Sequence, residues 1–149
     1  MIQKKPGARR KARELAVQAL YQYDVGNMKK EELENKDWME KNPIIEKAYS
    51  YFKEILAGCL QNLELLDDNI KEFATKYDFK EIMPIDRAIL RMGAYLILFE
   101  KTTPAVILIN EAVEIAKSFS GTDAHKFING VLDGIKAKLI QKGERTSHE

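Results

Sequence analysis

The first thirteen residues hold six basic side chains and no acidic one, a composition suited to holding an anion rather than to making or breaking a bond. Such a concentration of charge produces a local positive field that attracts polyanions, RNA and DNA among them. A solubilising tail, or a segment that contacts a membrane surface or an acidic protein, has the same composition, so these alternatives stay open. The basic residues of this arm (residues 1–13) are Lys4, Lys5, Arg9, Arg10, Lys11 and Arg13.

The arm runs directly into a segment with the apolar periodicity of a helix. At 100° per residue, Arg10, Arg13 and Tyr21 are predicted on the face opposite the apolar stripe. Gln18 lies beside them, and Val17 is the only aliphatic residue on that face, which argues against membrane binding. Cations for phosphates, a ring for stacking and an amide for a base edge are typical of proteins that bind single-stranded RNA. The spacing therefore favours nucleic-acid binding.

The rest of the chain lacks the groupings of common enzyme sites. His125 and His148 are the only histidines and Cys59 is the only cysteine, so neither a zinc-ligand pattern nor an internal disulfide is available. The adjacent Asp67 and Asp68 point in different directions on a helix, which favours capping or solvation over a catalytic pair. No glycine-rich phosphate loop occurs. We expect no enzymatic activity, no cofactor and no metal, with Cys59 as an inert core thiol and His125 on a helix surface.

The bulk composition predicts one globular domain with its own core. Of the 149 residues, 45% are hydrophobic and 32% charged. The 136 residues after the arm carry 18 basic and 23 acidic side chains, a net charge of −5. No apolar run reaches the roughly 20 residues of a membrane span, and no apolar segment of a secretion signal follows the arm. We expect a cytoplasmic protein with no membrane partner, and the single cysteine fits a reducing compartment.

Apolar periodicity and turn residues predict an all-α fold of six or seven helices in one compact domain, which divides near residue 80. Residues 1–142 are predicted to form the domain, and residues 143–149 a flexible tail. The charged stretch 28–42 is expected to hold a short helix within a long connection. The predicted helices cover residues 12–25, a segment opened by Pro43 that runs to Leu63, residues 66–77, residues 84–99, a segment opened by Thr103 and Pro104 that runs to Phe119, and a segment capped by Thr122 or Asp123 that runs to Leu139.

Three stretches of the chain stand out: ARRKARELAVQALYQYD, IDRAILRMGAYLILFE and INEAVEIAKSFSGTDAHKFINGVLDGI. Together they resemble the NusB family of bacterial transcription antitermination factors, and they follow one another in the family's order over nearly the whole chain. The resemblance implies two perpendicular three-helix bundles that bind RNA together with the ribosomal protein NusE. It further implies recognition of the boxA element of ribosomal RNA leaders within an RNA polymerase antitermination complex, and a role in ribosomal RNA maturation.

The resemblance also implies roles for individual residues. RNA contacts are implied for the arginine-rich motif, for Tyr21, which the helical geometry had already selected, and for Lys126 and Phe127. Periodicity alone places Phe127 at the edge of the apolar stripe of the last helix. Partner contacts are implied for Asp123, which spacing alone makes a helix cap, and for Asp86 and Glu81. The arginine-rich motif is Arg9, Arg10, Lys11 and Arg13.

Two other classes of protein remain as alternatives: the RNA-binding helical module of a ribosomal RNA methyltransferase system, and a helical protein–protein interaction module with a basic arm. The chain ends at Glu149 without a cofactor-binding βαβ region, which favours a stand-alone factor. A homodimer that covers the RNA surface is left open. Six cations allow a slope of log affinity against log salt no steeper than about −4, so we expect weak binding alone and a coupled complex with RNA and NusE.

Overall fold

The computed structural model describes residues 7–35, 45–121 and 123–146. Within them the chain forms seven α-helices, one short 3₁₀ helix and no strand, which confirms the predicted all-α class. Predictions that concern Lys4, Lys5, Pro43, Thr122 and His148 lie outside the described residues. The elements are α1 (Ala8–Val25), α2 (Lys30–Leu33), α3 (Ile45–Gln61), α4 (Leu63–Phe73), η2 (Phe79–Glu81), α5 (Pro84–Phe99), α6 (Ala105–Phe119) and α7 (Ala124–Gln141).

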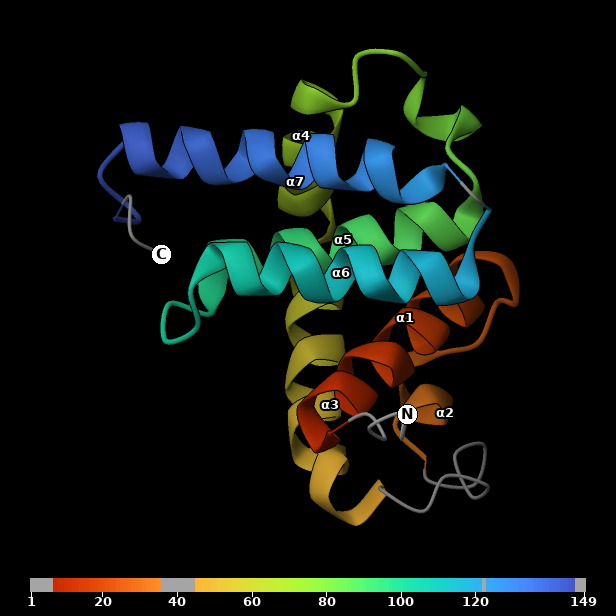
Figure 1. The fold of residues 1–149 in the computed structure, drawn as a ribbon. Coiled ribbons are helices and arrows are strands. Elements are labelled where there is room, and N and C mark those ends of the chain that lie inside the picture. The colour runs from red at the N-terminus through yellow and green to blue at the C-terminus, as the bar shows by residue number, and fades with distance from the viewer. Residues whose placement is uncertain (1–6, 36–44, 122, 147–149) are drawn as a thin grey trace, which may run out of the picture.

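Helix α5 is the centre of the fold. It contacts α1, α3, α4, α6 and α7, so ten of its sixteen residues are buried, as predicted for a helix packed on several sides. Helices α6 and α7 lie along it, and α1 and α3 pack below them in Figure 1. The approach of α7 is close, because a Cβ atom on Gly93 would lie 2.7 Å from Leu132 Cδ1.

Ion pairs fix how α1 lies along α5. In the first turn of α1, Arg9 pairs with Glu100, which directly follows α5. At the other end of α1, Asp24 accepts hydrogen bonds from Arg87 Nε and Nη2 at 3.0 and 2.7 Å. The two helices are therefore antiparallel, and the basic end of α1 lies at the carboxyl end of α5.

A second charged pair corrects a sequence prediction. Arg91, largely buried on α5, donates two hydrogen bonds to Asp67 on α4, from Nε to Oδ1 at 2.9 Å and from Nη2 to Oδ2 at 3.0 Å. Asp67 therefore holds a buried cation rather than capping a helix or facing water. Asp68 is exposed, as predicted, and Cys59 is fully buried, as predicted, with burial raising the pKa of its thiol.

The helix ends mostly follow the sequence signals. Helix α1 ends at Val25, directly before Gly26. The predicted break between α3 and α4 falls at Asn62, whose Nδ2 donates to the carbonyl of Gly58 at 2.8 Å. Helix α4 ends at Phe73, so the prediction that it continues to Tyr77 is wrong.

The last two helices also begin close to the predicted residues. Helix α6 begins at Ala105, so its N-cap is Pro104 and not the predicted Thr103. Helix α7 begins after Asp123, one of the two residues predicted to cap it, although no side-chain hydrogen bond caps it there.

The end of the described chain is anchored at Arg145, where we expected a frayed tail. Arg145 is buried, and its guanidinium donates to the carbonyls of Ile97 at 2.8 Å and of Thr103 at 3.0 Å, and also to that of Glu100. The last carbonyls of a helix receive no hydrogen bond from the helix itself. An arginine that donates to them therefore stabilises the helix end. The prediction is wrong for Arg145 because this contact bridges residues far apart in sequence.

Candidate nucleic-acid interface

The described part of the basic arm forms the first two turns of α1. The helix begins at Ala8 and has no acidic residue in its first turn. Cations near a helix N-terminus interact unfavourably with the helix dipole, so these basic residues destabilise the start of α1. Tertiary partners, or a bound anion, must compensate for it. The cations concerned are Arg9, Arg10, Lys11 and Arg13.

Arg13 is the main correction to the sequence analysis. Its side chain was predicted on the solvent face, but the residue is only 4% exposed, and its Nη1 donates to Glu111 Oε1 on α6 at 2.8 Å. Val17, predicted on the same outward face, is fully buried. A single apolar stripe underestimates the buried surface of α1, because α3 and α5 both pack against this helix.

The other described cations of the arm also have carboxylate partners. Arg9 Nη2 lies 3.1 Å from Glu100 Oε1 with the Arg9 side chain largely exposed, and Lys11 pairs with Glu14 at 3.7 Å. Arg10, partly exposed, donates through Nη2 to Glu111 Oε2. The hydrogen bond from Arg10 is the main cause that lowers the pKa of Glu111, and the same bond raises the pKa of Arg10.

Tyr51 on α3 completes this cluster, and the sequence analysis missed it. Its hydroxyl donates to Glu100 Oε1 at 2.5 Å, and the guanidinium of Arg9 lies 4.1 Å from the centre of its ring. Burial, followed by the hydrogen bond to Glu100, raises the pKa of Tyr51 to about 12. The phenol therefore stays protonated and donates at neutral pH, which fixes Glu100 beneath Arg9.

Further along α1, the two predicted RNA-facing residues differ in exposure. Gln18 is exposed, as predicted. Tyr21 is partly buried and packs against the core, so its predicted outward orientation is confirmed only in part. An exposed amide and part of one aromatic ring are thus accessible on this stretch of the helix.

A second cluster lies at the start of α7. Lys126 is highly exposed, with 75% of its side chain accessible, and lies 3.7 Å from Asp123, which is also exposed. Phe127 packs partly against the core and meets the ring of Tyr77 edge-on, with centroids 5.3 Å apart and an interplanar angle of 89°. Tyr77 is 52% exposed. Because α4 ends before Tyr77, the ring of Tyr77 can lie against Phe127. Periodicity had placed Tyr77 on the apolar face of a longer helix, so this contact was not predicted.

The three residues predicted to contact a partner come together beside this cluster. They line a cavity of about 290 Å³ between η2, the start of α5 and the start of α7. Glu81 and Asp123 are exposed on its rim, whereas Asp86 is 8% exposed and accepts a hydrogen bond from Ser120 Oγ. Asp86 therefore joins α5 to the end of α6 as well as facing the cavity. The lining residues are Tyr77, Glu81, Ile82, Met83, Asp86, Asp123, Ala124 and Phe127.

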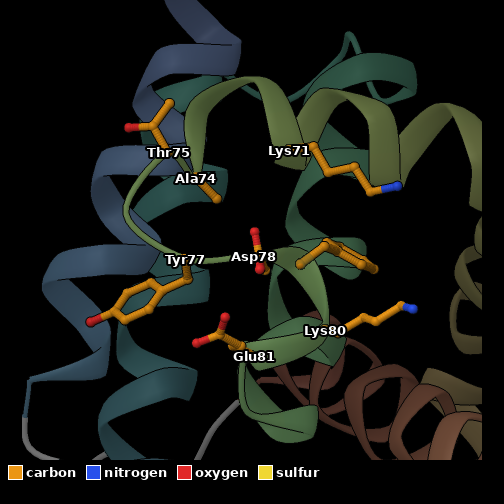
Figure 2. Close-up of a pocket in the computed structure, with 8 residues that line it drawn as sticks. Lys71, Ala74, Thr75, Tyr77, Asp78, Lys80 and Glu81 are labelled. Carbon is orange, nitrogen blue, oxygen red and sulfur yellow. The ribbon is translucent and has the colours of Figure 1, made fainter.

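A larger hollow of about 690 Å³ continues on the other side of Glu81, between the end of α4 and η2. Figure 2 shows the ring of Tyr77 pointing toward α7, whereas Lys71 and Lys80 point the other way. The carboxylates of Asp78 and Glu81 lie between them. This face of the molecule therefore presents exposed charges of both signs.

Comparison with known sequences decides the family. The sequence model of the NusB family matches residues 10–137. The chain belongs to the NusB family. The transcription antitermination protein NusB of Shewanella denitrificans is 40% identical over 138 residues, which are 93% of this chain and 99% of that protein. These matches confirm the resemblance that the sequence motifs indicated.

Solved structures agree with the NusB assignment. T. maritima NusB is 32% identical, with a TM-score of 0.75, over 91% of this chain and 94% of that chain. NusB from a structure of the antitermination factors NusB and NusE in complex with double-stranded RNA has a TM-score of 0.70. It is 24% identical over 88% of this chain and 97% of that chain, and this likeness shows the shared fold alone.

The NusB match includes most of the predicted site residues. Lys4, Lys5 and Arg9 precede the matched range, whereas every other predicted RNA or partner residue lies within it. Glu111, which holds two of the arm's arginines, also lies within it. It belongs to the NEA motif that carried the resemblance, but nothing in local sequence indicates a partner 98 residues away.

The described residues of this NusB-family chain contain no group of three or more histidine, cysteine, aspartate or glutamate side chains placed to hold a metal ion. Among the helices they form, none is long and apolar enough to cross a membrane. The chemistry available at the two clusters is that of guanidinium, ammonium, carboxylate and aromatic groups.

Proposed function

We propose that this protein binds single-stranded RNA of the boxA type from ribosomal RNA leaders, together with the ribosomal protein NusE, as part of an RNA polymerase antitermination complex. In this role it supports the transcription and maturation of ribosomal RNA. The observation that carries the proposal is the NusB family match, which includes the last residues of the basic arm, from Arg10 on, and the start of α7.

The two clusters have the chemistry that single-stranded RNA requires. Arg9, Lys11 and Lys126 carry exposed or partly exposed cations for phosphates. The Tyr77–Phe127 pair offers an exposed ring on which an unpaired base can stack. The arm lies at the carboxyl end of α5 and the α7 cluster near its amino end, about 24 Å apart at 1.5 Å per residue. RNA that contacts both must be several nucleotides long, and α1 with Gln18 and Tyr21 lies along the way.

The carboxylates around the smaller cavity support a basic partner. Glu81 and Asp123 are exposed on its rim and Asp86 faces it, so a lysine or arginine side chain of a ribosomal protein would meet complementary charge there. Phe127 lines the same cavity and flanks Tyr77. A partner at the cavity and RNA at the ring pair would therefore adjoin each other, and this proximity supports coupled binding.

Titration of labelled boxA RNA, with and without NusE, tests the proposal. We expect weak binding alone and tighter binding with NusE; equal affinities would refute the coupling. Because every described cation of the arm is paired with a carboxylate, we expect a salt slope shallower than the limit of about −4 set by six free cations.

A lysine substitution at each end of α7 provides the matched comparison. Lys126→Ala should weaken RNA binding, whereas Lys142→Ala, an exposed cation just past the other end of α7, should not. Equal losses would indicate a general electrostatic attraction instead of a site at the start of α7.

A further inference from the structure

Glu111 on α6 is shared by two arginines of the arm. Arg13 Nη1 donates to its Oε1 at 2.8 Å, and Arg10 Nη2 donates to its Oε2. Both carboxylate oxygens are therefore occupied by α1. Glu111 is partly buried, with 19% of its side chain accessible, so it is bound at the junction of α1 and α6 and does not move freely in solvent.

The two arginines are held to different degrees. The side chain of Arg13 is only 5% exposed and also lies 4.0 Å from Glu100 Oε2. That of Arg10 is 29% exposed and donates its hydrogen bond to Glu111. Arg13 thus anchors Glu111 to α1, whereas Arg10 can leave the carboxylate for solvent or for another anion.

A carboxylate and a phosphate offer a guanidinium the same fork of oxygen acceptors. RNA that uses Arg10 must therefore displace it from Glu111. The existing contact also satisfies Arg10 incompletely, because its Nε is buried without an acceptor among the described residues. The two non-bridging oxygens of an RNA phosphodiester can accept from Nε and Nη2 together, so the exchange is possible but its net gain is small.

We propose that Glu111 determines how strongly the arm discriminates between RNAs, because its carboxylate holds Arg10 in the place that an RNA phosphate would otherwise take. Any RNA can offer a phosphate, but only RNA that also gains stacking and partner contacts elsewhere has enough binding energy to displace Glu111. The residue therefore weakens binding to arbitrary RNA more than binding to the recognised sequence. This inference rests on the proposed function, since it assumes that the arm contacts RNA.

The experiment compares Glu111→Gln with Glu114→Gln. Both remove one negative charge from the same region of α6. Glu114 is exposed and pairs with Lys117 on its own helix at 3.3 Å, and it acts on Arg10 through its charge rather than by holding it as Glu111 does. Each variant and the unmodified chain are titrated with labelled boxA RNA and with oligouridine of equal length, at several salt concentrations.

For Glu111→Gln we expect the affinity for oligouridine to rise about threefold to fivefold, the contribution of one partly exposed ion pair. The salt slope should become more negative by about 0.7, as expected for one additional phosphate contact. The affinity for boxA RNA should rise less, so the ratio of the two affinities falls. Glu114→Gln should change both affinities equally and leave the slope unchanged. Adding Arg10→Ala to Glu111→Gln should remove the gain.

Three results would overturn the inference. Equal behaviour of the two glutamine variants would show that Glu111 acts only through its net charge, and weaker binding of both RNAs would show that it positions Arg10 for RNA. A gain that survives Arg10→Ala would locate the effect elsewhere. If Glu111→Gln does not fold, Glu111→Asp keeps the anion for Arg13 but draws it away from Arg10, and a smaller gain of the same kind is expected. If the unmodified chain binds neither RNA, with or without NusE, the proposed function itself fails.

Discussion

Replacement of Arg13 by alanine tests whether this residue belongs to the fold or to the RNA surface. The sequence places it on the solvent face of α1, whereas the structure buries it against Glu111 and 5.6 Å from the ring of Tyr51. If the structural placement is correct, Arg13→Ala lowers the free energy of unfolding. If the outward placement were correct, the substitution would affect RNA binding alone.

The expected loss in the free energy of unfolding depends on which partners Glu111 keeps after Arg13→Ala. Removing one partner of a fully buried ion pair costs about 3–5 kcal/mol, because the other charge stays buried without compensation. Glu111 is less isolated than that: Arg10 still binds it and part of its side chain reaches solvent. We therefore expect about 2 kcal/mol for Arg13→Ala, which corresponds to a fall in Tm of roughly 4–8 °C for a chain of this size.

Urea unfolding followed by circular dichroism measures this loss, with two comparison variants. Arg10→Ala removes a partly exposed partner of the same carboxylate and should cost at most about 1 kcal/mol. Arg13→Met keeps the aliphatic stem and removes the charge, so it separates lost packing from the lost ion pair. Unfolding free energies of Arg13→Ala and Arg10→Ala that agree within error would refute the buried role of Arg13.

Three further predictions concern aromatic and terminal contacts. Tyr77→Ala should weaken RNA binding by about 1–3 kcal/mol with little change in Tm, because the ring is half exposed; a large fall in Tm with unchanged RNA affinity would contradict its stacking role. In a titration followed by ultraviolet absorbance, Tyr51→Phe should remove the one phenol with a midpoint near pH 12. Since its folded pKa is raised, its contribution to stability is present below pH 10 and lost as the pH rises through 12, and a Tyr51 midpoint near 10 would refute the buried hydrogen bond. Arg145→Ala should lower the free energy of unfolding by about 1–3 kcal/mol by leaving carbonyls at the end of α5 without their donor, and should speed cleavage of the C-terminus by protease; unchanged proteolysis would contradict the anchoring.

The sequence predicts well what local signals determine. Glycine at position 26, proline at position 84 and the apolar stripes locate the helices, and the packing of α5 on several sides follows from its apolar residues. The burial of Cys59 follows from the same periodicity. The exposed amide of Gln18 was also predicted, because it lies far from every apolar stripe.

The wrong predictions concern side chains whose burial or contacts depend on a partner far away in the sequence. Arg13 has an ordinary position on a helical wheel, and only the approach of α6 with Glu111 buries it. Arg145 is charged and close to the end of the chain, yet the carbonyls at the end of α5 hold it. Tyr77 fits the helical period of α4, but the helix stops four residues earlier, and the ring pairs with Phe127. None of these partners is visible from periodicity or composition.

One partly buried arginine, Arg87, relates the α1 surface and the cavity rim to each other. Arg87 on α5 holds Asp24 near the end of α1, three residues after Tyr21. Its Nη1 also donates to the carbonyls of Phe79 and Ile82 at 3.4 and 3.3 Å. Those carbonyls belong to η2 and to the residue that follows it, and this segment carries Glu81 to the rim of the cavity. The last turn of α1 and the cavity rim are thus fixed to the same guanidinium. RNA and a partner bound here would meet surfaces tied to the same arginine, and coupling between them would then come from direct contact between the two ligands.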